Sequence, residues 1–118
     1  LKPPKSIEEI VPNQELPVSV IEKIVYWSRF YGADTNVMIE TAWCESRFHP
    51  QAFNPNDPKG GAKGVFQFLK PTFDAFQKEM GVKGLDIWNA SDNIRVASWG
   101  FANKKESHWT CFNRLSRR

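Results

Sequence analysis

The chain has 118 residues, 41% of them hydrophobic and 25% charged, which suits one compact domain with a modest core and leaves too little chain for two. The net charge of +3 is only mildly basic, and no basic stripe is interleaved with aromatic residues, so nucleic-acid binding is not expected. No apolar run is long enough for a membrane span. The aromatic share of 14% suits a core, and it also suits a groove on which sugar rings stack.

The first predicted element is a proline-containing arm over residues 1–17, because proline at four positions denies regular backbone hydrogen bonding. The main domain is predicted over residues 18–115, followed by a basic tail over 116–118. Its first helix is predicted over residues 18–31 and ends where Gly32 can adopt the left-handed conformation. The spacing predicts that one face of this helix is buried, consisting of Ile21, Ile24, Val25, Ser28 and Tyr31.

A second helix is predicted to begin at Asp34 or Thr35, with Met38, Ile39 and Ala42 facing inward. Glu45 follows this face at helical spacing and lies near the helix C-terminus. Burial and the negative end of the helix dipole both disfavour a carboxylate, so both are expected to raise the pKa of Glu45. A glutamate that is protonated near neutral pH can act as a general acid. An ordinary solvated helix glutamate is the alternative interpretation.

Residues 51–63 are rich in turn-forming residues, and the short run from Gly64 to Phe68 is predicted to be extended or irregular. Gln67 is the one amide in that run. An amide in a cleft can offer both a donor and an acceptor to a sugar, but taken alone Gln67 fits better as a structural amide whose hydrogen bonds are satisfied. Two further helices are predicted, one from Pro71 to Met80 and one from about Asn89 to Lys105. Tight helix contact would explain Gly100.

Two cysteines permit only one intramolecular disulfide, between Cys44 and Cys111, which would indicate an oxidising compartment. Two unrelated reduced thiols are the alternative. A third hypothesis is a four-ligand zinc site in which His49 and His108 join both cysteines, although neither pair has the usual spacing of a zinc knuckle. We therefore expect no metal. No nucleotide-binding or redox-cofactor motif is present, and no cofactor is expected.

Several short motifs together resemble the lysozyme-like fold: Cys44-Glu45-Ser46, then Gly64-Val65-Phe66-Gln67-Phe68, then Asn93-Ile94, then Trp109 and Cys111. More narrowly, they are similar to soluble lytic transglycosylase catalytic domains and to resuscitation-promoting-factor domains, which act on bacterial peptidoglycan. The resemblance runs from about residue 20 to residue 115. It implies a mainly α fold of the α+β lysozyme-like class, with a short extended or β segment beside a cleft.

The resemblance also implies roles for individual residues. Glu45 would be the catalytic acid, Ser46 would help to position it, and Gln67 would contact the substrate. Cys44 and Cys111 match a pair that ties the catalytic helix to the C-terminal segment in the resuscitation-factor type. One departure is the lack of an Ala-Tyr-Asn motif, whose tyrosine approaches the catalytic glutamate in many transglycosylases. The candidate substrate-binding set is Ser46, Phe66, Gln67, Phe68, Asn93 and Trp109.

Glycosidic cleavage needs a proton for the leaving oxygen and stabilisation of the sugar cation, commonly by a second carboxylate. The sequence offers no aspartate in a convincing position, and Asp57, in the loop, is the least implausible base. A single-acid reaction fits this pattern: Glu45 protonates the leaving oxygen and the C6 hydroxyl of the sugar closes onto C1. The expected activity is lytic transglycosylation between N-acetylmuramic acid and N-acetylglucosamine, with muramidase hydrolysis as the alternative.

A non-catalytic module that binds peptidoglycan or chitin, or a structural part of an envelope or phage-tail assembly, is the alternative outside enzymes. Under the enzymatic hypothesis the partner is the peptidoglycan glycan strand, and the protein is expected to act as a monomer. The substrate and the possible disulfide together predict a secreted or cell-envelope location.

Overall fold

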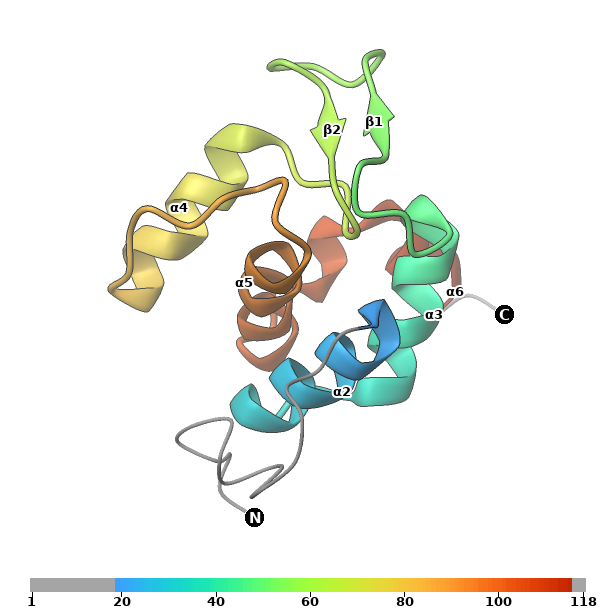
Figure 1. The fold of residues 1–118 in the computed structure, drawn as a ribbon, viewed down its shortest axis with the longest axis vertical. Coiled ribbons are helices and arrows are strands. Elements are labelled where there is room, and N and C mark those ends of the chain that lie inside the picture. Colours follow the sequence, from blue (N-terminus) through green and yellow to red (C-terminus); the bar gives the residue numbers. More distant parts are fainter. Residues whose placement is uncertain (1–18, 116–118) are drawn as a thin grey trace.

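The computed structural model describes residues 19–115 (Figure 1). The predicted arm over 1–17 and the tail over 116–118 therefore lie outside the described residues. Within 19–115 the chain forms five α-helices, one 3-10 helix and a two-stranded antiparallel sheet. The elements in order are α2 (Val20–Tyr31), α3 (Thr35–Ser46), β1 (Phe53–Asn54), β2 (Ala62–Lys63), α4 (Lys70–Met80), α5 (Ala90–Ala102), η1 (Glu106–His108) and α6 (Thr110–Leu115). The prediction of a mainly helical domain with a short β segment is confirmed.

The helix boundaries follow local signals in the sequence. Asp34 caps α3 by accepting a hydrogen bond from the backbone N–H of Val37 at 3.1 Å. Asn89 caps α5 in the same way, accepting from the N–H of Asp92 at 3.0 Å. Gly32 ends α2 with φ 80°, a conformation that costs glycine little because it has no Cβ. Each of these boundaries was predicted, although α5 ends at Ala102, three residues before the predicted end.

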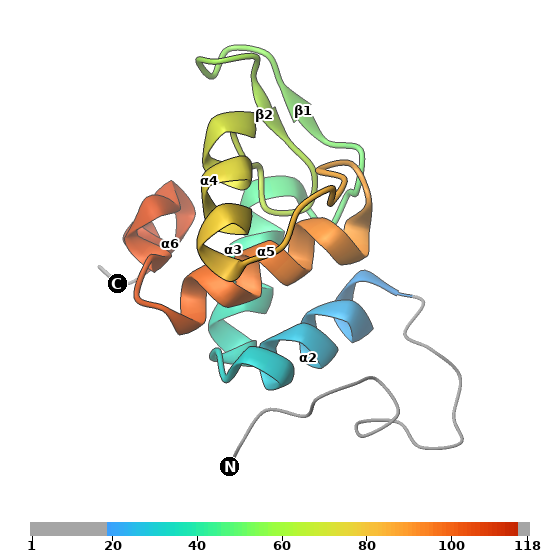
Figure 2. The same cartoon turned by 90° about the vertical axis from the view of Figure 1, so that its left-hand side faces the viewer.

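Helix α2 packs along α5, as both views of the ribbon show (Figures 1 and 2). The indole N–H of Trp27 donates to Ser91 Oγ at 2.9 Å, and Arg95 Nε donates to the hydroxyl of Tyr31 at 2.9 Å. Ile24 and Ser28 are buried, as predicted, but Ile21 is 44% exposed. Helical spacing identifies a common face, but it cannot say where along that face the neighbouring helix stops.

Helix α5 is the central element of the core. Its buried positions are occupied by Asn93, Ile94, Val96, Ala97, Ser98 and Gly100. A Cβ on Gly100 would lie 2.9 Å from Phe76 and 3.0 Å from Trp109, closer than side chains pack. The close approach of α4 and of the segment around Trp109 to α5 therefore requires glycine at this position, as the sequence indicated.

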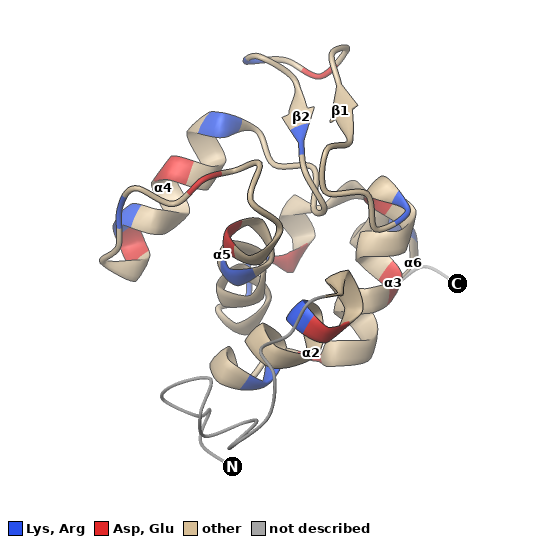
Figure 3. Ribbon diagram, in the orientation of Figure 1, with Lys and Arg blue, Asp and Glu red and all other residues tan. Residues whose placement is uncertain are grey.

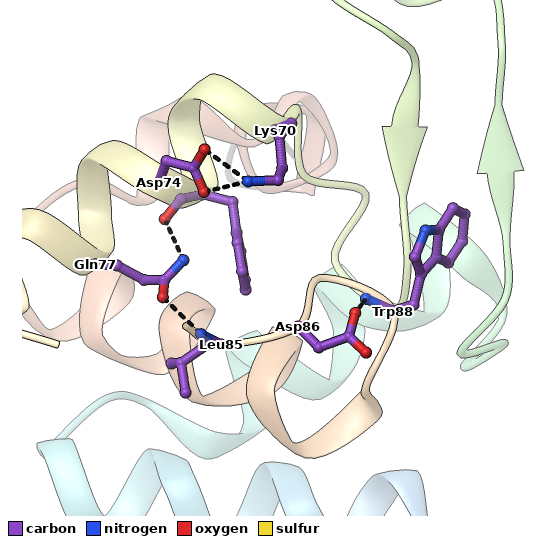
Figure 4. Close-up of polar contacts among 7 residues, drawn as sticks. Lys70, Asp74, Gln77, Leu85, Asp86 and Trp88 are labelled. Atoms are coloured by element: carbon purple, nitrogen blue, oxygen red, sulfur yellow. Dashed lines mark hydrogen bonds and ion pairs between the residues drawn. The ribbon is translucent and has the colours of Figure 1, made fainter. Parts of the chain in front are cut away.

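Helix α4 carries a buried amide that fixes the connection to α5. Gln77 donates from Nε2 to the carbonyl of Phe73 at 3.4 Å and accepts from the N–H of Leu85 through Oε1 at 3.0 Å (Figure 4). A buried amide without partners would be costly, so these bonds offset its burial. On the outer side of the helix, Lys70 and Asp74 form an exposed ion pair at 2.6 Å, a geometry that contributes little to stability.

The β-hairpin is joined to the core through Asn93 of α5. The side-chain oxygen of Asn93 accepts from the N–H of Phe66 at 2.9 Å, and its Nδ2 donates to the carbonyls of Lys63 at 3.2 Å and Ile87 at 2.9 Å. Gly64 has φ 82°, and a Cβ there would lie 2.3 Å from Asn93 Nδ2. The Asn93 side chain thus holds the turn after β2 in place. Only glycine at position 64 lets the turn come this close to Asn93.

Candidate active site

Glu45 lies in the last turn of α3, one residue before the helix ends. Arg47 closes the helix with φ 55°, and its backbone N–H bonds to the carbonyl of Trp43. The carboxylate of Glu45 is turned toward the start of α6, where its Oε2 accepts a long hydrogen bond of 3.4 Å from the backbone N–H of Cys111. Two segments that are 66 residues apart in the sequence thus meet at this carboxylate.

A disulfide joins Cys44 to Cys111, with their Cα atoms 5.9 Å apart. The disulfide prediction is therefore confirmed, and the zinc hypothesis fails because disulfide-bonded cysteines offer no thiolate to a metal. Arg114 lies beside the bridge, with Nη2 3.4 Å from the sulfur of Cys44 and 3.5 Å from that of Cys111. The bridge fixes α6 against the end of α3, next to Glu45.

A small pocket of about 130 Å³ opens in front of Glu45. Asp57, from the loop between β1 and β2, lines the same pocket and places a second carboxyl group in it. The complete lining is Glu45, Asp57, Ala62, Gln67, Leu69, His108, Trp109 and Thr110. Two larger hollows, of about 490 and 500 Å³, also open on the described surface, and neither is lined by a buried carboxyl group.

Burial raises the pKa of Glu45 from 4.5 to about 7. The hydrogen bond from Cys111 and the positive charge of Arg114 oppose this rise, whereas the negative charge of Asp57 adds to it. A carboxyl group with a pKa near 7 is protonated in about half of the molecules at neutral pH. It can therefore deliver a proton and take one back under the same conditions, as a general acid and base must.

Gln67 lines the pocket from the turn after β2, where its backbone adopts φ 51°. Its Nε2 donates to the carbonyls of Ala52 and Gly64, each at 3.0 Å. Both bonds use the donor end of the amide. Within the described residues no donor bonds to Oε1, so the acceptor end is available to a ligand in the pocket.

Four other residues of the predicted substrate-binding set are structural in this arrangement. Ser46 is 8% exposed and its hydroxyl donates to the carbonyls of Val65 at 2.7 Å and Ala42 at 3.3 Å. Phe66, Phe68 and Asn93 are at most 1% exposed, so none of them presents surface to a glycan. The turn from Gly64 to Gln67 directs both phenylalanines into the core and leaves only the amide between them at the pocket.

Trp109, the last residue of that set, lines the pocket although it is only 3% exposed. Its indole N–H donates to the carbonyl of Phe66 at 2.9 Å, and its ring stacks on Phe101 with the centroids 4.6 Å apart. Trp109 therefore forms a fixed wall of the pocket and ties the C-terminal segment to the Gln67 turn.

His108 and Thr110 also line the pocket, and neither was predicted to do so. One signal in the sequence pointed to them: both lie within three residues of Cys111. If Cys111 bonds to the residue before Glu45, its neighbours must lie near Glu45 as well. Burial lowers the pKa of His108, which favours the neutral imidazole at neutral pH.

Outside the pocket, charged residues are distributed over the described part of the chain (Figure 3). Lys and Arg are spread over several elements and alternate with acidic residues (Figure 3). Among residues 19–115, no group of three or more potential His, Cys, Asp or Glu ligands is arranged to hold a metal ion. No helix in this part of the chain has both the length and the apolar character that a bilayer crossing needs.

A small helical domain with a β-hairpin beside a glutamate at a helix end defines the class: this is a lysozyme-like fold. The family model described as "Transglycosylase SLT domain" matches residues 22–110. The chain belongs to this family, as its short motifs suggested, and membership assigns it glycan cleavage of the lytic transglycosylase type on peptidoglycan at the level of the family. No curated protein and no solved structure matches the chain.

Proposed function

We propose that this protein is a lytic transglycosylase that cleaves peptidoglycan strands between N-acetylmuramic acid and N-acetylglucosamine, with Glu45 as its single acid and base. The observation that carries this proposal is a carboxyl group with a pKa of about 7 in a polar pocket of an SLT-family domain. Family membership supports the reaction class, and the environment of Glu45 supports the residue.

In the proposed reaction, protonated Glu45 gives its proton to the glycosidic oxygen as the bond from C1 to that oxygen breaks. The C6 hydroxyl of the same muramic acid then bonds to C1, and the Glu45 carboxylate takes the hydroxyl proton. The products are a 1,6-anhydro-muramyl end and a strand with a free 4-hydroxyl group. The intramolecular hydroxyl is held near C1, so proximity takes the place of an attacking water. Glu45 ends the cycle protonated.

The remaining pocket residues support this reaction by position. Gln67 offers Oε1 as an acceptor for a sugar hydroxyl or acetamido N–H, and its own donors are fixed by backbone carbonyls. Cys111 supplies the N–H that orients the Glu45 carboxylate. The Ala-Tyr-Asn motif, whose tyrosine approaches the catalytic glutamate in many transglycosylases, is absent from this sequence, and the described contact to the Glu45 carboxylate is this backbone N–H.

Digestion of purified peptidoglycan by the wild type and by Glu45→Gln, with mass spectrometry of the released muropeptides, tests the proposal. We expect anhydro-muropeptides from the wild type and a loss of activity of at least about a thousandfold in the variant. A matched control is Glu40→Gln, an exposed glutamate of the same helix. Anhydro products that persist in Glu45→Gln would show that another residue supplies the proton.

Asp57 supports a second candidate, a muramidase that hydrolyses the same bond. It lies in the pocket with Glu45, so it could activate a water on the opposite face of the sugar in an inverting reaction. This enzyme would release reducing muramic acid ends in place of anhydro ends. The same mass spectra distinguish the two, because the two ends differ by one water.

A non-catalytic role in binding peptidoglycan or chitin, or in an envelope or phage-tail assembly, predicts no product that depends on Glu45. For the enzyme we propose a monomer that acts outside the cytoplasm. The disulfide and the substrate both support an envelope or secreted location.

A further inference from the structure

A second hollow adjoins the catalytic pocket on the side of η1. It has a volume of about 500 Å³ and is lined by Phe76, Lys104, Lys105, Ser107 and His108. His108 also lines the pocket that contains Glu45. The two spaces thus share His108 in their walls, and a polymer that extends from one to the other would pass this residue.

The lining of this hollow is cationic. Lys105 lies 3.6 Å from Glu79 and 5.9 Å from the ring of Trp99, so its charge is partly balanced. Lys104, with φ 62°, forms no ion pair with any of the described residues. The hydroxyl of Ser107 likewise has no hydrogen-bond partner there, since only its carbonyl is bonded, by Asn113. The hollow therefore holds one free ammonium group and one free hydroxyl, both suited to an anion.

The size and charge of the hollow select a ligand that is anionic and larger than a single sugar hydroxyl. The proposed substrate carries such a group at a fixed place: the lactyl ether of each muramic acid bears a peptide with free carboxylates. If the glycan occupies the pocket of Glu45, the peptide on the muramic acid leaves beside that pocket. We propose that the hollow lined by Lys104, Ser107 and His108 is a subsite for a carboxylate of the peptidoglycan stem peptide. This inference rests on the proposed substrate and deepens it.

The test compares two forms of one substrate: intact peptidoglycan, and the same glycan strands after an amidase has removed the stem peptides. For Lys104→Gln we expect kcat/KM to fall about fivefold on intact strands, the size of one exposed charge-assisted contact. On stripped strands the amidase leaves only the lactyl carboxylate beside the sugar ring, so we expect no change if the hollow binds a carboxylate of the peptide. Lys104→Arg keeps the charge and should retain the rate. Lys83→Gln removes an exposed lysine that lies outside both pockets, so it controls for net charge.

Equal effects of Lys104→Gln on both substrates, or no effect on either, would overturn the subsite. Binding separates this outcome from a failure of the proposed reaction. In sedimentation with insoluble peptidoglycan, Glu45→Gln should bind intact strands about fivefold more tightly than the double variant with Lys104→Gln. This result is expected even if the wild type releases no product.

Phosphate groups of polymers linked to peptidoglycan are the other source of anions. A third form of the substrate distinguishes them from the carboxylates of the stem peptide. Hydrofluoric acid removes polymers that are linked to peptidoglycan through phosphodiesters and leaves the stem peptides in place. The Lys104 dependence should survive this treatment. Its disappearance would assign the hollow to wall phosphate and overturn the assignment to the peptide.

Discussion

Cys111 contacts helix α3 twice, through a disulfide to Cys44 and through its backbone N–H to the carboxylate of Glu45. The covalent bond is made to the residue next to the glutamate, and the hydrogen bond is made to the glutamate itself. One residue of α6 therefore helps to position the proposed acid and also lowers its pKa, against the larger effect of burial.

Removal of the disulfide is expected to destabilise the domain. In the chain-entropy model, a bridge across 67 residues contributes about 4 kcal/mol, a large share of the stability of a small domain. We therefore expect the Cys44→Ala/Cys111→Ala variant to unfold at a markedly lower urea concentration than the oxidised wild type. Reduced wild type should match the variant. Coincident urea midpoints for oxidised and reduced protein would show that the bridge adds no stability.

The pH dependence of cleavage should follow the protonation of Glu45. A general acid must be protonated, so kcat/KM is expected to be flat below the pKa of about 7 and to fall tenfold per pH unit above it. Initial rates between pH 4.5 and 9 measure this limb. The single-acid reaction predicts no second carboxylate limb. A fall on the acid side that disappears in Asp57→Asn would instead support the hydrolase.

The charges near Glu45 should move that alkaline limb in opposite directions. Asp57→Asn removes a negative charge that raises the pKa of Glu45, so the limb should shift to lower pH. Arg114→Gln removes a positive charge that lowers this pKa, so the limb should shift to higher pH. The pH–rate profiles of the two variants provide the check. Shifts in the same direction would contradict the assignment of the limb to Glu45.

Glu45 is also expected to reduce stability at high pH. Its pKa is about 4.5 unfolded and about 7 folded, so the folded state binds the proton more tightly and stability falls as the pH rises from 4.5 to 7. Glutamine does not ionise, so the stability of Glu45→Gln does not fall with pH for this reason. At pH 8 we expect the variant to be more stable than the wild type by on the order of 2 kcal/mol, allowing for solvent screening. Urea denaturation at pH 4 and pH 8 should show the advantage growing with pH.

A matched pair of glycines tests the contact between the Gln67 turn and α5. Gly64 and Gly81 have φ values of 82° and 76°, so alanine meets similar backbone strain at both. A Cβ at Gly64 would also lie 2.3 Å from Asn93 Nδ2, whereas at Gly81 nothing lies within 4 Å. Gly64→Ala should therefore cost about 2 kcal/mol more than Gly81→Ala, by denaturant unfolding. Equal costs would mean that the turn can move away from Asn93.

Most of the fold was predicted from local signals in the sequence, such as helix caps and helix ends. The caps at Asp34 and Asn89 and the helix end at Gly32 depend on a few neighbouring residues, so the sequence was sufficient to place them. Helix α6 has only six residues, too few for a periodic pattern. It is held by its disulfide and by Trp109 rather than by its own sequence pattern, and it was not predicted.

The candidate site was predictable only in part, because its walls come from distant segments. The location of Glu45 at the end of an inward-facing helix was evident from spacing. The approach of Asp57 to Glu45 depends on how the hairpin folds back, which no local pattern records. Phe66 and Phe68 flank Gln67 in sequence, yet the turn after Gly64 sends them into the core. The prediction that Phe66 and Phe68 bind substrate was therefore wrong, because it relied on their being next to Gln67 in the sequence.

The attachment of α6 also has a consequence for the order in which the pocket forms. The pocket combines residues from three parts of the chain. Glu45 comes first, Asp57 and Gln67 follow it, and Trp109 and Cys111 come much later. A ribosome makes these parts in that order, so a growing chain carries the proposed acid before it carries the residue that bonds to its carboxylate. We therefore expect the proposed activity to arise only after residues 109–111 have been made and have packed against the end of α3.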